Sequence, residues 1–291
     1  MASRTRSAPK AEICLIYKSF VIINTLYDIL IPMETKTGQL IINALVLLIL
    51  VFFAPVLAGQ AENSPDVNTI VEKMDRLYRS DTSYGDVEMT IRTENWERTL
   101  RMDIWSEGLD RTLIHINSPK KDAGIATLRK KTEMWNYFPK INKVIKVPPS
   151  MMMSSWMGSD FTNDDLVKES SMLDDYHSGL ITPDNANPDY YYIELIPKKD
   201  IPIVWARIEL VVRKKDYIPV EESFFDEKGR RMRLMEFSEI KNFSGRDIPS
   251  VLVMKPLNKP EKETVIKYKE LKFDIKLKAD TFSLRNLQKR K

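Results

Sequence analysis

The chain has 291 residues, with 45 basic side chains, 41 acidic side chains and a single cysteine. The formal net charge of +4 gives no support to nucleic-acid binding, which usually requires a strongly basic surface. The length is sufficient for one sizeable domain in addition to an N-terminal targeting segment.

The N-terminal part of the chain has the pattern of a secretory signal peptide. Residues 40–54 form an almost unbroken apolar run, Lys36 precedes this run, and small residues follow it. A charged start, an apolar core and a small-residue cleavage site are typical of a signal peptide. We therefore expect a signal peptide at 33–61, cleaved after Ala58 or Ala61, and export of the rest of the chain.

Two alternatives concern this N-terminal part. Residues 40–57 could remain as an uncleaved membrane anchor, although 18 residues are at the lower limit for crossing a bilayer. Residues 1–32 do not fit ahead of a signal peptide. We therefore interpret them as an upstream extension, with Met33 as the expected start of the protein.

The predicted exported part, residues 62–291, is expected to form a single domain without cysteine, because Cys14 lies upstream of it. It can form no disulfide, and it has neither a thiol nucleophile nor a thiolate metal site. Five of the 45 basic and three of the 41 acidic side chains precede residue 62, so the domain has a net charge near +2.

The domain is predicted to begin with a helix and to continue as antiparallel strands. Ser64, Pro65 and Asp66 form a typical helix start, and apolar residues then recur at helical spacing as far as Leu77. From Tyr84 onwards apolar and polar residues alternate, which is typical of half-buried strands. Strands are expected at 87–91, 100–104, 111–119, 123–131, 133–139, 141–148, 190–197, 206–213, 218–226, 230–240, 248–257 and 264–275.

Three local features are predicted within this series of strands. Residues 226–229 form a hairpin turn that ends in glycine. In the last strand the apolar residues change from even positions, such as Tyr268, to odd positions, such as Leu271, which indicates a β-bulge between them. The stretch 161–189 is acidic and polar and is expected to interrupt the sheet.

From these twelve candidate ranges we expect ten or eleven strands and little helix, which predicts a mainly β fold with one large antiparallel sheet. Such a sheet must bury its apolar face, and with few helices available it is expected to curl upon itself. The prediction is an incomplete, unclosed antiparallel β-barrel covered by a few α-helices. The helix that begins near Ser64 and the methionine-rich segment after Pro148 are the expected covers.

Motifs for catalysis are weak. His115 lies inside a predicted strand, His177 lies in the polar interruption, and the sequence has no HExxH, GxSxG or phosphate-binding glycine loop. The acidic pairs at 164–165 and 174–175 lack the spacing and the glycine of a calcium-binding EF-hand loop. We predict that the protein is not an enzyme and has no catalytic residue, metal or cofactor.

Apolar and aromatic residues are the better candidates for a function. Methionines suit surfaces that hold ligands of variable shape, and a cavity lined by methionine and aromatic residues can hold an acyl chain. A helical turn that ends at Gly158 would place Met152, Met153, Trp156 and Met157 on one side; the alternative is that this turn is ordinary core. The predicted acyl-chain cavity or lid residues are Trp105, Trp135, Tyr137, Met151, Met152, Met153, Trp156, Met157 and Phe161.

Two stretches of the chain resemble a known family. "MWNYFPKINKVIKVPPSMMMSSWMGSDFTNDDL" and the closing "LKADTFSLRNL" are similar to segments of the LolA-like outer-membrane lipoprotein-sorting proteins, in their divergent, longer branch. The resemblance covers nearly all of residues 62–291. It implies an incomplete barrel whose apolar cavity accepts the acyl chains of lipoproteins or other lipids. Arg98 and Arg101 are both candidates for the family's lid-anchoring arginine.

The leading hypothesis is therefore a periplasmic carrier that binds acyl chains and hands them towards the outer membrane. The resemblance also implies an RND-type inner-membrane transporter as a partner, and hence an alternative: an accessory subunit that docks on such a transporter without cargo of its own. A continuous apolar cavity would favour the carrier, and a filled core would favour the accessory subunit. A third hypothesis, an enzyme that acts on lipids or envelope glycans, would be favoured by ionisable residues clustered inside the cavity.

Overall fold

The computed structural model describes residues 65–167, 172–199 and 204–289. The expected signal peptide at 33–61, the upstream extension at 1–32 and the first residues of the predicted domain lie outside the described residues. Within the described part of the chain, no helix is both long and apolar enough to cross a membrane.

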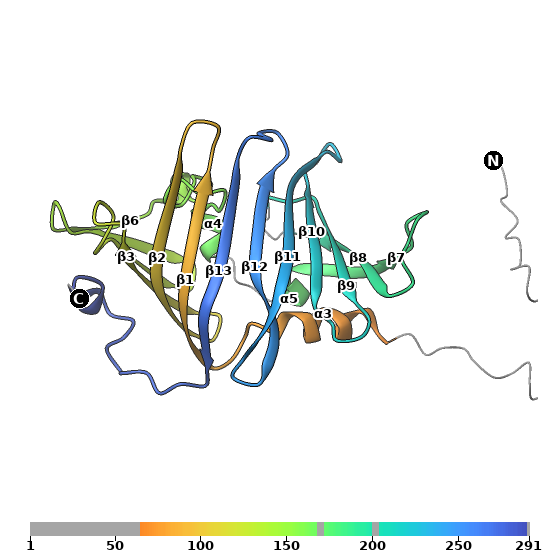
Figure 1. The fold of residues 1–291 in the computed structure, drawn as a ribbon, viewed down its shortest axis with the longest axis horizontal. Coiled ribbons are helices and arrows are strands. Elements are labelled where there is room, and N and C mark those ends of the chain that lie inside the picture. Colours follow the sequence, from red (N-terminus) through yellow and green to blue (C-terminus); the bar gives the residue numbers. More distant parts are fainter. Residues whose placement is uncertain (1–64, 168–171, 200–203, 290–291) are drawn as a thin grey trace, which may run out of the picture. The chain divides into compact units, whose positions relative to one another are not determined.

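The described residues form one 13-stranded antiparallel sheet (Figure 1). The strands are β1 (Thr82–Arg92), β2 (Glu97–Glu107), β3 (Arg111–Ser118), β4 (Ala126–Lys130), β5 (Glu133–Phe138), β6 (Lys143–Lys146), β7 (Tyr176–Ile181), β8 (Tyr190–Pro197), β9 (Arg207–Arg213), β10 (Pro219–Phe225), β11 (Arg231–Phe243), β12 (Arg246–Pro256) and β13 (Glu263–Phe273). Their order across the sheet is β6-β5-β4-β3-β2-β1-β13-β12-β11-β10-β9-β8-β7. The sheet ends at β6 and β7, so the predicted open, antiparallel architecture is confirmed.

The helices are short. They are α3 (Val67–Asp75), α4 (Asn163–Val167), α5 (Met172–Asp175) and α6 (Leu284–Leu287), and a 3-10 turn, η1, covers Pro149–Met151. The predicted first helix is confirmed as α3, but its N-cap is Asp66, two residues after the expected capping residue Ser64. Its apolar residues Ile70, Val71 and Met74 are buried in a cluster with residues of β8 and β9. The spacing read from the sequence therefore identifies the face that packs on the sheet.

The structure has more strands than the ten or eleven predicted. β7 lies in the acidic stretch that was expected to interrupt the sheet. It is an edge strand that pairs only with β8, and most of its side chains are partly or fully exposed. Only Tyr176 of β7 is buried, so the strand has no strict alternation of apolar and polar residues, and alternation is the signal that identifies a strand in a sequence.

Two of the predicted local features are confirmed. The pairing of β1 with β13 passes from Asp86–Glu270 to Val87–Tyr268, so the bulge lies at Lys269, inside the predicted interval. The hairpin from β10 to β11 turns at 226–229, where the Gly229 amide donates to the Asp226 carbonyl at 2.9 Å. Gly229 has a φ of +72°, a conformation that glycine adopts without strain.

The two faces of the sheet have different coverings. Side chains alternate between the faces along each strand. In β4, Ala126 and Leu128 pack with Leu287 of α6 on what we call the outer face. Thr127 and Arg129 point to the other side, the inner face, where they line a cavity. The inner face also contacts α3, which packs on β8 and β9.

Candidate functional site

A cavity with a volume of about 980 Å³ lies on the inner face of the sheet. This volume is near the upper end of the roughly 300–1,000 Å³ that small-molecule pockets usually span. Its wall is mainly apolar in the middle of the sheet, where it is formed by Val87, Met89, Met102, Ile104, Leu252 and Ile266. The cavity is therefore large enough, and apolar enough, for a ligand that carries a hydrocarbon chain.

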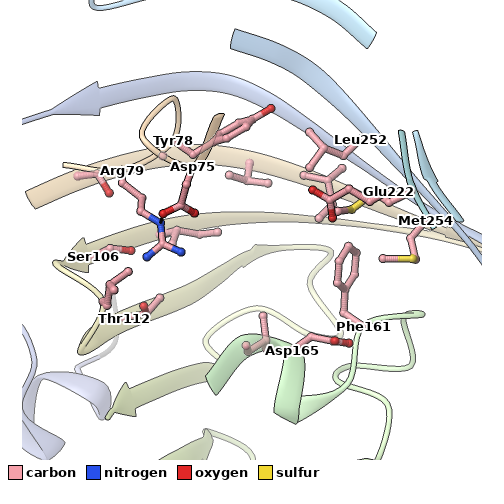
Figure 2. A pocket seen from close by; sticks show the side chains of 18 of the residues that line it. Asp75, Tyr78, Arg79, Ser106, Thr112, Phe161, Asp165, Glu222, Leu252 and Met254 are labelled. Carbon is pink, nitrogen blue, oxygen red and sulfur yellow. Dashed lines mark ion pairs between the residues drawn. The ribbon is translucent and has the colours of Figure 1, made fainter. Parts of the chain in front are cut away.

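The cavity wall also has polar residues at both ends. Figure 2 shows Arg79, Ser106 and Thr112 near one another at one end, and Glu222 at the other. An amphiphile, with an apolar chain and a polar group, matches this distribution better than a pure hydrocarbon does.

Residues 149–167, which we call the cover segment, contribute Trp156, Phe161, Asp164, Asp165 and Leu166 to the cavity wall. The predicted helical turn in this segment is wrong: after η1 the chain forms a short hairpin. The Trp156 amide donates to the Phe161 carbonyl at 2.8 Å, and Ser155 forms a β-bridge with Thr162. Met157 and Gly158 have φ values of +52° and +81°, which suit a tight turn and interrupt a helix.

The first half of the cover segment is held to the strands on one side of the sheet. Trp156 Nε1 donates to Thr127 Oγ1 of β4 at 3.2 Å. The Arg98 guanidinium of β2 donates to the Met157 carbonyl, whereas Arg101 pairs with Asp86 of β1. Of the two arginines that are candidates for the family's lid-anchoring residue, Arg98 is thus the one that contacts the cover segment.

The second half of the cover segment is held to the other side of the sheet. Thr264 Oγ1 of β13 donates to Asp160 Oδ2 at 2.6 Å. Arg233 of β11 makes two hydrogen bonds with the Asp165 carboxylate, at 2.8 and 3.1 Å. Burial acts to raise the pKa of Asp165, but the Arg233 guanidinium and the hydrogen bonds from Thr162 outweigh it and lower the pKa. The segment therefore spans the inner face from β4 to β11.

Charged side chains lie on the cavity wall, a feature that would favour an enzyme. Two of them form an ion pair, in which Arg79 Nε lies 2.7 Å from Asp75 Oδ2 (Figure 2). Burial raises the pKa of Asp75 in spite of this pair. Arg233 is paired with Asp165, as described above. Each of these charged side chains thus has a partner of opposite charge, and the ion pairs explain why they lie on the wall of a mainly apolar cavity. The described residues contain no cluster of three or more potential metal ligands.

Glu222 differs from these paired residues. Its side chain lies on the inner face of β10, only 6% of the residue is exposed, and it lines the cavity. Burial raises the pKa of Glu222 to about 7, with a smaller opposing effect from Arg233 and a further increase from Asp75. This carboxyl group is consequently protonated in part of the molecules at neutral pH.

The predicted site residues fall into three groups. Trp156 and Phe161 line the cavity. Met152 and Met157 pack against the inner-face core, whereas Met151 and Met153 are 51% and 49% exposed. None of these four methionines lines the cavity. Trp105, Trp135 and Tyr137 belong to the outer-face cluster, because alternation along β2 and β5 directs them away from the cavity. Ligand contact by these residues stays a prediction.

Several residues of the cavity wall were not predicted from the sequence. They are Glu222, Asp75, Arg79 and Arg233. A signal exists for Glu222, since it shares a face of β10 with Phe224 and thus occupies an apolar position of an alternating strand. Asp75 is the last residue of α3 and Arg79 lies beyond its end. The helical spacing in the sequence indicates which residues of α3 are buried, but it gives no indication of a cavity near these two residues.

The open antiparallel sheet with a cover segment across its inner face is a LolA-like fold. A DUF1329 family protein from Desulfovibrio piger is 24% identical, with a TM-score of 0.68 over 76% of this chain and 99% of that chain. A putative outer membrane lipoprotein-sorting protein domain from Vibrio parahaemolyticus is 20% identical, with a TM-score of 0.66 over 76% and 97%. A LolA superfamily protein from Nitrosomonas europaea is 21% identical, with a TM-score of 0.64 over 76% and 98%.

These similarities confirm the predicted LolA-like resemblance at the level of the fold. Residues 108–289 match a family model whose description reads "Uncharacterized protein", and the chain belongs to this family. No curated protein matches the chain.

Proposed function

We propose that the protein is a carrier that binds the acyl chains of lipoproteins or other lipids in its inner-face cavity and hands them towards the outer membrane. The observation that carries this proposal is the cavity itself, which has a volume of about 980 Å³ and a mainly apolar wall in the middle of the sheet. Similarity to lipoprotein-sorting folds supports the same function.

The energetics of such a cavity suit reversible binding. Burial of one methylene contributes about 0.8 kcal/mol, so about ten buried methylenes contribute about 8 kcal/mol before the costs of association. A free energy of this size corresponds to a dissociation constant that is at best micromolar. A carrier has to release its cargo to an acceptor, and this affinity allows release without a chemical step.

We propose that the carrier works in the periplasm. The support for this location is the signal-peptide pattern at 33–61 together with the lipoprotein-sorting similarity of the fold. The cavity favours a carrier over the alternative of a cargo-free accessory subunit on an RND-type transporter, for which a filled core is expected.

The proposal is tested by mass spectrometry of an organic extract of the protein, purified from a periplasmic fraction without detergent. We expect an acyl lipid or a lipopeptide in near-stoichiometric amount. Trp156→Ser should reduce this amount, because Trp156 lines the cavity, whereas Met153→Ser should retain it, because Met153 is about half exposed. Thermal melting of both variants checks that they are folded.

Two results would overturn the carrier function. An empty protein that also takes up no fluorescent fatty-acid probe would favour the accessory subunit. Time-dependent cleavage of an added lipid, seen as new products in the same extract, would favour an enzyme. Equal lipid content in the two serine variants and the wild type would remove Trp156 from the binding site.

A further inference from the structure

The side chain of Glu222 places a buried carboxyl group on the wall of the cavity. In the sheet it pairs with Leu210 of β9 and Met235 of β11, and partners directly opposite one another share a face. Its two neighbours across the sheet are therefore apolar. Figure 2 shows the Phe161 ring pointing from the cover segment towards the part of the wall that holds Glu222 and Leu252.

The charged and titratable groups around Glu222 are already engaged with other partners. Arg233 donates to Asp165, and its guanidinium lies 4.7 Å from the centre of the Phe224 ring. Asp75 pairs with Arg79. The Tyr78 hydroxyl donates to the Pro249 carbonyl at 3.0 Å. Within residues 65–167, 172–199 and 204–289, no hydrogen bond or ion pair is formed by the Glu222 side chain.

Glu222 faces the cavity, so a ligand that fills the cavity without offering a partner would leave this carboxyl group buried without a hydrogen bond, which is costly. A carboxylate would require a cation that is itself stripped of water, and burying both charges is expensive. A protonated carboxyl group requires only a neutral oxygen as acceptor. The burial that raises the pKa of Glu222 to about 7 favours the second arrangement.

We propose that the Glu222 carboxyl group donates a hydrogen bond to an ester or amide oxygen of a bound acyl lipid, and so selects oxygen-bearing lipids over plain hydrocarbons. This inference rests on the proposed carrier function and names the class of its cargo. The apolar wall at Met89, Met102 and Ile266 then holds the chain, and Glu222 fixes the position of the linkage between the chain and the rest of the lipid.

The test compares two ligands of similar chain length, methyl palmitate and octadecane, as competitors of a bound fluorescent fatty-acid probe. In the wild type we expect methyl palmitate to bind about three to ten times more tightly, the effect of one net hydrogen bond. Glu222→Met, which has no donor, should lose this preference. Glu222→Gln, which keeps a donor of similar shape, should retain it.

Glu221→Gln is the matched control. Glu221 precedes Glu222 in the same strand, and its carboxylate accepts hydrogen bonds from Ser223 and Arg231. The substitution removes the same charge from the opposite face, so the preference for methyl palmitate should be unchanged. Thermal melting of each variant shows whether it is folded.

The pH dependence separates a neutral donor from a carboxylate. The wild-type preference for methyl palmitate should decrease between pH 6 and pH 8, as Glu222 loses its proton, whereas that of Glu222→Gln should stay constant.

The proposal is overturned if Glu222→Met keeps the preference, or if hexadecylamine competes best at pH 8 and only when Glu222 is present. Binding of the probe to every variant, with an unaltered preference, would refute the role of Glu222 and leave the carrier function intact. Failure of the wild type to bind the probe would refute the carrier function and this inference with it.

Discussion

Two groups of aromatic side chains lie on opposite faces of the same sheet, and they are covered differently. On the outer face, Trp105 and Trp135 belong to a cluster that Phe282 and Leu287 of the C-terminal segment complete. On the inner face, Trp156 and Phe161 belong to the cover segment and border a cavity. The same residue types therefore form a packed core where the short helix α6 packs on the sheet. They form a cavity wall where the hairpin of the cover segment crosses the inner face.

The physical reason for this difference lies in how each cover is attached. The outer cover packs directly on the sheet through apolar side chains such as Leu287, which is fully buried. The inner cover packs on the sheet through Trp156 and its neighbours and is also held by polar contacts at its two sides, through Arg98 and Thr127 on one side and Asp165 on the other. Attachment at the sides leaves unfilled space in the middle, and that space is the candidate binding site.

The largest effect on stability is expected from the outer face. Leu287→Ala should lower the free energy of unfolding by about 3 to 4 kcal/mol, because it leaves a hole in a packed cluster. Urea denaturation measures this loss, and uptake of a fluorescent fatty-acid probe under native conditions should be unchanged. Leu284→Ala, on the same helix but 45% exposed, should alter stability by less than about 0.5 kcal/mol. Loss of probe uptake in Leu287→Ala would show that the two faces are coupled.

On the inner face, Glu222 should make the protein less stable as the pH rises. Its pKa increases from 4.5 to about 7 in the folded protein. The folded state thus holds the proton more tightly, and the resulting stability is complete below pH 4.5 and lost as the pH rises through 7. The loss is about 3 kcal/mol.

Urea unfolding at pH 5 and pH 8 measures this loss. Glu222→Gln should remove about that amount from the difference in unfolding free energy between the two pH values, whereas Glu221→Gln should keep the wild-type difference. An identical pH dependence in Glu222→Gln and the wild type would contradict the burial of an ionisable carboxyl group at this position.

The attachment of the cover segment is tested by Asp165→Asn. This change removes the anion that pairs with Arg233, and it should cost about 2 kcal/mol of stability at pH 7. Because the folded-state pKa of Asp165 is lowered, its contribution to stability is present above pH 3.8 and is lost as the pH falls through the lower folded value.

Stopped-flow measurements on Asp165→Asn should show faster release of the fatty-acid probe than in the wild type. Asp174→Asn in α5, an exposed acid, serves as the control. Release at the wild-type rate would mean that the cover segment does not limit exit.

The smallest effect is expected from single apolar contacts with the ligand. Phe161→Ala should weaken probe binding about tenfold, since it removes one aromatic side chain from the cavity wall. Met153→Ala, in the same segment but about half exposed, should leave the affinity within about twofold of the wild-type value. Fluorescence titration measures both. Equal affinities in the two variants would place the ligand away from the cover segment.

Much of the fold could be predicted from local patterns. Helical spacing identified α3 and its buried residues Ile70 and Val71, and alternation identified most of the strands. A change of parity located the bulge at Lys269. These predictions succeeded because each depends on which face of one element is buried, and a regular element shows this in its own sequence. β7 was missed for the same reason, because an edge strand has no strongly buried face.

The candidate site was less predictable. The sequence indicated that the methionine-rich segment matters, but Trp156 and Phe161 are the predicted residues that line the cavity. Assigning an aromatic residue to the inner or outer face of β2 or β5 requires knowledge of which face α6 covers. Arg233 and Asp165 are 68 positions apart, and no local pattern connects them.

The sequence by itself therefore determined the class of the fold, the position of its bulge and the absence of cysteine after residue 61. Only the tertiary structure decided which aromatic residues face the cavity, how the cover segment is attached, and that Glu222 is buried. The physical reason is that burial within one element follows from the periodicity of its own residues. A cavity, by contrast, is space left between elements, and its wall is set by contacts between residues far apart in the chain.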